Sequence, residues 1–325
     1  MADEQLRALE RRWAATRLPE DEQALVQARV RAGRIDGATL TLAAALGSRS
    51  ARRCLGGLAE VGLPDHPTRW LEAITARLGP DVALRGAVAA LRHLLPLWEG
   101  RSERCARHGF RECAEVLCRP DPRVRHALER VEGDLVLSSP LPAEARVTLA
   151  GSLADCELAA WDAGSERSGG YDVDATLRHV ARAAAWGVAA LLAREGGQEL
   201  RERHAQERRL GVAPYGGPRV FLRSAVPKHL RLEEELPWPE LVGPFTQAAM
   251  EEALVCVRAH TREDAARRGI DGAYALAEAQ RALRAAMGAA LVPWLLGLGD
   301  PLAERAHGST STTSGAGPAA TRTSV

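Results

Sequence analysis

Residues 172–195, DVDATLRHVARAAAWGVAALLARE, hold the apolar pattern around which the rest of the chain is organised. Apolar side chains recur there at steps of three and four: Leu177, Val180, Ala184, Val188 and Leu191. This spacing places them on one face of a helix. No residue between Ala183 and Ala193 is charged, so the helix is apolar most of the way round and should be buried on several sides. The following pair, Gly196 and Gly197, suits the left-handed turn that ends a helix.

A membrane-spanning role for this helix is not expected. Its uncharged run is shorter than the ~18–20 residues that a bilayer requires. The longest uncharged run that is mainly apolar, Ala285–Gly299, is also short and contains Pro293. The first residues, MADEQLRALERRW, are charged and lack the apolar core of a signal peptide. We therefore expect a cytoplasmic location, where the six cysteines would be free thiols and not disulfides.

The composition favours a helical protein with a substantial core. Hydrophobic residues make up 46% of the 325 residues, alanine is abundant, and β-branched and aromatic residues are sparse. The 43 basic residues nearly balance the 42 acidic ones, so the net charge of the chain does not favour binding to nucleic acid or anionic lipid. We predict an all-α fold of stacked helical hairpins, arranged as an irregular α-solenoid or a helical bundle.

Capping residues and glycines divide the chain into helices of roughly 10–20 residues joined by short turns. Asp36, either Ser48 or Ser50, and Asp271 are placed to cap helices, since a short side-chain oxygen can accept a free backbone N–H there. The predicted organisation has four parts: an N-terminal helical-hairpin array (1–133), a connector (134–141), a C-terminal helical bundle (142–306) and a disordered tail (307–325).

A long helix is predicted over Pro142–Asp162, directly after the connector. Its expected inner side consists of the large apolar residues Val147, Leu153, Leu158 and Trp161.

The stretch 42–56, LAAALGSRSARRCLG, carries a small-residue pattern over residues 43–56. The residues that form it are Ala43, Ala44, Gly47, Ala51, Leu55 and Gly56. The pattern resembles half of a Sel1-type helical repeat. In such repeats the small residues let two antiparallel helices pack closely, so the resemblance implies a tight helical hairpin here.

The segment 211–244 interrupts the helical pattern with six prolines. It also carries Tyr215, Phe221 and Trp238, which make it too apolar for a disordered linker. Two interpretations stay open. The segment is either a strap that covers the apolar ends of helices or a binding loop in which these three aromatic residues contact a partner.

One group of residues has the chemistry of a zinc site: Cys105, His108, Cys113 and Cys118. On one continuous helix, however, Cys105 and Cys113 differ by roughly 80° in direction, and Cys113 and Cys118 by about 140°. A break near Gly109 would be needed to bring them together. Buried free cysteine is the commoner explanation, and we expect neither a metal nor a cofactor.

A second group, Glu252, Cys256 and His260, stacks at steps of four along one helical face. A histidine beside a cysteine can take its proton and create a nucleophilic thiolate, which a carboxylate could help to orient. The apolar neighbours Leu254 and Val257 oppose this role, because an apolar setting raises the pKa of a thiol.

No phosphate loop, nucleophile elbow, zinc-binding histidine pair or calcium loop is present in the sequence. We therefore expect a protein-interaction or scaffold module with a protein partner, since packed helix pairs create extended surfaces. The alternative is an enzyme whose site lies near Glu252, Cys256 and His260 or is lined by the segment 211–244.

Overall fold

The computed structural model describes residues 2–56, 67–100, 121–137, 140–164, 175–210 and 237–305. Within these ranges the chain forms twelve α-helices, a further helical turn at 301–305 and one short 3-10 helix, without a strand. The predicted all-α class is confirmed. The predicted tail, 307–325, lies outside the described residues. In the described part, no helix combines the length and the apolar character that crossing a bilayer requires.

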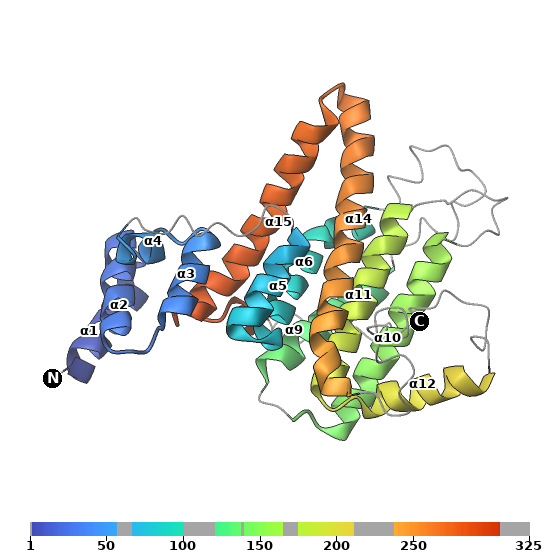
Figure 1. The fold of residues 1–325 in the computed structure, drawn as a ribbon, viewed down its shortest axis with the longest axis horizontal. Helices are drawn as coiled ribbons and strands as arrows, with labels where there is room; N and C mark the ends of the chain where they lie inside the picture. The colour runs from blue at the N-terminus through green and yellow to red at the C-terminus, as the bar shows by residue number, and fades with distance from the viewer. Residues whose placement is uncertain are drawn as a thin grey trace, which may run out of the picture.

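The central helix, α11 (Ala175–Arg194), lies between α10 (Ala143–Gly164) and α14 (Val242–Arg268) (Figure 1). It also contacts α6 (Pro80–Glu99) and α9 (Arg123–Val136). Every residue from 183 to 193 is buried. The predicted burial of this helix on several sides is therefore confirmed, and the surroundings of α11 are those of a helical bundle.

The packing of α11 combines one large ring with small neighbours. Trp186 is 2% exposed and stacks on Phe245 of α14, with ring centroids 5.5 Å apart.

The helix ends at Gly196 and Gly197, whose φ angles are +94° and +67°. A side chain at Gly197 would also collide with Trp238, because a Cβ there would lie 2.5 Å from the Trp238 Cβ. Glycine is thus required at this turn by both backbone geometry and space.

The remaining helices of the bundle surround this centre. α5 (Pro67–Leu78) and α15 (Gly272–Leu295) pack against α6, and α12 (Gln198–Leu210) follows α11. The upper parts of α14 and α15 form a hairpin that projects from the rest of the bundle (Figure 1).

The predicted irregular segment 211–244 ends earlier than expected. Residues 211–236 lie outside the described part, but the 3-10 helix η3 (Trp238–Leu241) leads directly into α14, which begins at Val242. Pro244 therefore lies in the first turn of α14. The prediction was wrong there because a proline in the first turn removes no intrahelical hydrogen bond, so it does not break the helix.

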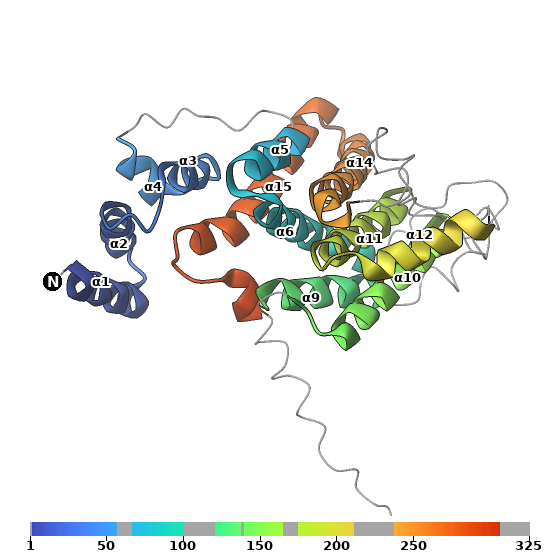
Figure 2. The ribbon, with the colours of Figure 1, turned by 60° about the horizontal axis from the view of Figure 1, so that its bottom comes forward.

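Four short helices occupy one end of the molecule: α1 (Ala2–Thr16), α2 (Pro19–Arg31), α3 (Gly37–Ala45) and α4 (Arg49–Cys54) (Figures 1 and 2). α2, α3 and α4 share a smaller apolar core that includes Val26, Leu40 and Leu296, the last of which follows α15. Arg29 fixes this junction, since its Nη1 donates to the backbone oxygen of Leu296 at 2.7 Å. α3 and α4 cover the stretch that resembles a Sel1-type repeat, and that resemblance stays a prediction.

The predicted caps are confirmed at three helices. The side chain of Asp36 accepts from the Thr39 N–H at 2.7 Å and begins α3. Ser48 accepts from Ala51 at the start of α4, and Asp271 accepts from Tyr274 at the start of α15. Each cap satisfies a backbone donor that the helix itself leaves unpaired.

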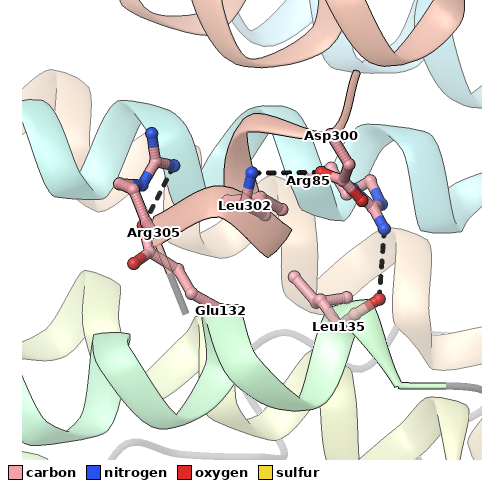
Figure 3. Close-up of polar contacts among 6 residues, drawn as sticks. All are labelled: Arg85, Glu132, Leu135, Asp300, Leu302 and Arg305. Atoms are coloured by element: carbon pink, nitrogen blue, oxygen red, sulfur yellow. Dashed lines mark hydrogen bonds and ion pairs between the residues drawn. The ribbon is translucent and has the colours of Figure 1, made fainter. Parts of the chain in front are cut away.

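The segment after α15 folds back across α6 and α9 and is held by charged side chains (Figure 3). Arg85 of α6 is 9% exposed; its Nη1 donates to both carboxylate oxygens of Asp300 at 3.0 Å, and its Nη2 donates to the Leu135 oxygen of α9 at 3.2 Å. Arg305, at the end of the following helical turn, pairs with buried Glu132 of α9 at 3.3 Å. We call this arrangement the C-terminal clasp.

Helices on both sides of the predicted connector share one hydrophobic core. Val88 of α6 and Leu128 of α9 belong to the same buried cluster as Leu153 of α10 and Leu191 of α11. α9 also continues to Val136, so the first residues of the stretch 134–141 are helical.

Candidate protein-interaction face

Helix α10 carries two apolar stripes with the same spacing. The first stripe is buried and consists of Leu149, Leu153, Cys156, Ala160 and Ala163. The second is displaced by two residues towards the N-terminus, is exposed, and consists of Val147, Gly151, Ala154 and Leu158. Because each residue advances the helix by about 100°, a displacement of two residues places the stripes on nearly opposite faces. We call the exposed stripe the outer face of α10.

The outer face has two large apolar side chains with small residues between them. Val147 is 66% exposed and Leu158 is 51% exposed. They lie eleven residues apart, which corresponds to about 16 Å along the helix. Gly151 and Ala154 leave the surface between them low enough for the backbone of another helix to approach closely. Half-buried Trp161 continues the apolar surface towards the end of α10.

This arrangement corrects the predicted inner side of the helix. Leu153 is buried as expected, but Val147 and Leu158 point outward. The prediction was wrong for these two residues because both stripes repeat at steps of four and three. Periodicity alone cannot decide which of two such stripes faces the core.

Acidic residues line one edge of the outer face. At about 100° per residue, Glu144, Asp155 and Asp162 all fall on the same side of the stripe. Asp162 pairs with Arg123 at 2.6 Å, whereas the exposed carboxylates of Glu144 and Asp155 form no ion pair within the described part of the chain. The edge is thus negatively charged along most of the helix.

The core side of α10 is chemically inert. Cys156 is completely buried, and this burial raises the pKa of its thiol far above the ordinary value. Next to it, Glu157 forms an ion pair with Arg203 of α12. The buried stripe therefore serves packing, whereas the outer face of α10 is exposed.

Of the predicted group Glu252, Cys256 and His260, the first residue contacts a neighbouring helix. The Glu252 carboxylate lies between two residues of α11: one oxygen is 2.5 Å from His179 Nδ1, and the other is 2.7 Å from Arg182 Nη2. Cys256 is completely buried and His260 is half-buried. Glu252 thus joins α14 to α11. His179 and Arg182 were missed because they lie about 70 residues away in the sequence, and no local spacing indicates such a contact.

The other predicted site residues do not form a site in the described structure. Cys105, His108, Cys113 and Cys118 lie outside the described residues, as do Tyr215 and Phe221. Trp238 is 2% exposed and packs on Gly197, so its ring is part of the core and not of the surface. Within the described ranges, no three histidine, cysteine or acidic side chains lie close enough together to hold a metal ion.

Fold and surface together define an all-α protein with a central buried helix and a second apolar stripe exposed on an outer helix. Comparison with known protein families, curated proteins and solved structures found no match to this chain. The function is therefore inferred from the contacts and charges of its own residues.

Proposed function

We propose that this protein is an interaction module that binds an amphipathic helix of a partner protein along the outer face of α10. The observation that carries the proposal is the exposure of Val147 and Leu158 on one face, with Gly151 and Ala154 between them. Burying a large apolar side chain is worth about 1.5–3 kcal/mol, and this gain is only partly realised at either residue in the isolated chain. Exposed apolar surface of this kind is typical of protein-binding sites.

The charges beside the stripe specify the chemistry of the partner helix. Glu144 and Asp155 would face basic residues on one edge of a helix whose apolar residues recur at steps of three and four. Such charge complementarity accelerates association and selects the orientation of the bound helix. We infer that the partner segment carries arginine or lysine beside its apolar stripe.

Site-specific photo-crosslinking in the native cell tests this function. A photoreactive amino acid at Ala154, which is exposed on the outer face, should crosslink to one defined partner peptide that has an apolar stripe and basic residues beside it. The additional substitution Leu158→Arg should abolish the crosslink. The same photoreactive residue at exposed Ala14 of α1 is the matched control and should not yield this peptide.

Two results would contradict the proposal. Crosslinks from Ala154 that persist unchanged in the Leu158→Arg variant would show contact without the predicted recognition. A crosslinked peptide without basic residues would exclude the proposed partner chemistry.

A second candidate function, an enzyme site at Glu252, is favoured by the contact of this carboxylate with His179. A carboxylate bound to Nδ1 orients an imidazole for general-base chemistry. A nucleophilic Cys256 would have to react with small electrophiles in the native protein, although its side chain is buried. Peptide-mapped alkylation with iodoacetamide separates the two functions: rapid labelling of Cys256 relative to half-buried Cys54 would favour the enzyme, and protection of Cys256 would favour the interaction module.

We also propose a cytoplasmic location for this module. The cysteines of the described part, Cys54, Cys156 and Cys256, are free thiols, which suits a reducing compartment. Fractionation of native cells with detection of the tagged full chain tests the location.

A further inference from the structure

A cavity of about 220 Å³ lies between α6 and α15, beside the C-terminal clasp. Alanine side chains of both helices form its walls, among them Ala89 and Ala290. Its polar lining consists of Arg92, His93 and Arg305. Sites for drug-sized ligands usually measure about 300–1,000 Å³, so this cavity suits a smaller molecule.

The C-terminal clasp positions one of the two arginines. Asp300 is held by Arg85, and this contact brings the following helical turn across α6 (Figure 3). Arg305 then reaches the edge of the cavity while its Nη2 contacts Glu132 at 3.3 Å. The clasp thus places Arg305, which is distant in the sequence from Arg92, at the same cavity.

Arg92 brings a hydrogen-bond donor that the described protein does not satisfy. Its Nη1 atom is buried and donates to no acceptor in the described part of the chain. The nearest carboxylate oxygen, on Glu129, is 3.8 Å away and lies equally far from Arg125. Because Glu129 lies beyond hydrogen-bonding distance and is shared with Arg125, the charge of Arg92 is only partly compensated in the described part of the chain. The buried Nη1 itself is closed to a ligand, which would contact the part of the Arg92 side chain that lines the cavity.

The lining of the cavity is basic, although Arg305 already pairs with a carboxylate outside the lining. Glu132 is the buried carboxylate near both arginines. Burial raises its pKa, and this effect is larger than the lowering by Arg305 and Arg92. This group faces Arg305 from α9, whereas the lining of the cavity itself contains no acidic residue. Exposed His93 adds a further donor at the rim.

We propose that this cavity binds a small oxyanion, a phosphate or carboxylate group, through the guanidinium groups of Arg92 and Arg305. Arginine is well suited to this role because its planar array of donors matches the oxygens of either group. The alanine walls would accept no more than a short apolar body beside the anionic group. The site is independent of the outer face of α10 and of its partner.

Calorimetric titration of the full chain with inorganic phosphate and, separately, with acetate tests the proposal at constant ionic strength. At least one anion should bind saturably with one-to-one stoichiometry. The variant Arg92→Gln should weaken binding about tenfold or more, because it removes one guanidinium from the site. The matched control Arg262→Gln, at an exposed position of α14 away from the cavity, should leave binding unchanged.

A second variant keeps the test decisive if Arg92→Gln lowers folding stability. Ala286→Leu fills the cavity without removing charge and should also abolish binding. Stronger binding of phosphate would assign the site to phosphate groups, and stronger binding of acetate would assign it to carboxylates. The proposal is overturned if neither anion binds saturably up to about 10 mM, or if both cavity variants bind as the unmodified chain does.

Discussion

Trp186 shows at the scale of one residue how the core of this protein is built. The indole is 2% exposed, is surrounded by small residues of its own helix and stacks on Phe245. Large aromatic side chains in such positions contribute more than any other residue type to the burial of apolar surface. The stability of α11 in the bundle therefore depends strongly on this ring.

Truncation of this ring gives the first prediction. Trp186→Ala should lower the free energy of unfolding by about 3–5 kcal/mol, from lost apolar burial and an unfilled cavity. Urea denaturation followed by circular dichroism measures the change. Tyr274→Ala, which removes an aromatic ring that is 62% exposed, is the control and should change stability by less than about 0.5 kcal/mol. A loss at Trp186 no larger than that of the control would refute the central position of α11.

A glycine at the crossing of α15 and α3 gives the second prediction. A Cβ at Gly288 would lie 2.5 Å from the backbone oxygen of Leu46, which cannot move without shifting α3. Gly288→Ala should therefore destabilise the protein by about 1–3 kcal/mol, as overpacking does elsewhere. Gly133→Ala in α9 meets no atom within 4 Å and should instead stabilise by about 0.5–1 kcal/mol. Thermal melts of the two variants should shift in opposite directions, and shifts in the same direction would contradict the close crossing.

At the scale of the element, the sequence predicts where helices begin and end better than which way they face. The caps at Asp36, Ser48 and Asp271 depend on atoms within one turn, so local spacing was sufficient to find them. The orientation of α10 depends instead on which of its two stripes meets α11, and this is decided by the rest of the chain. Val147 and Leu158 were therefore placed on the wrong side.

The candidate sites follow the same rule. The pairing of Glu252 with His179, and the clasp of Arg85 with Asp300, join residues that are far apart in the sequence. No local sequence pattern predicts either contact. The outer face of α10 was visible in the sequence as apolar residues, but its exposure became apparent only in the structure.

At the scale of the whole molecule, buried carboxylates in α9 make stability depend on pH. Burial raises the pKa of Glu132 and of Asp134, and this effect outweighs the neighbouring arginines. The folded protein therefore holds protons that the unfolded chain releases, and stability falls as pH rises from the ordinary carboxyl pKa to the raised one. The exposed carboxylates of Asp36 and Asp264 have the opposite effect, because hydrogen bonds lower their pKa values in the folded protein. Their contribution to stability is lost as pH falls below the ordinary carboxyl pKa.

Replacement of Glu132 gives the third prediction. Glu132→Gln should reduce the fall in unfolding free energy over this pH window, without abolishing it, because Asp134 still titrates. Urea denaturation at a series of pH values above the ordinary glutamate pKa measures the slope. Glu144→Gln, at an exposed position of α10, is the control and should keep the slope of the unmodified protein. An unchanged slope in Glu132→Gln would mean that this carboxyl keeps its ordinary pKa.

The central claim is that α10 packs with one face and binds with the other, and a matched pair of leucine substitutions on this helix tests it most directly. Leu153 is 1% exposed and Leu158 is 51% exposed, so the same change to alanine probes opposite faces. We predict that Leu153→Ala lowers the unfolding free energy by about 2–5 kcal/mol, whereas Leu158→Ala lowers it by no more than about 1 kcal/mol. The measurement is urea denaturation of the two purified variants side by side. Equal losses at both positions would show that Leu158 is buried in the folded protein and would contradict an outer face available for a partner.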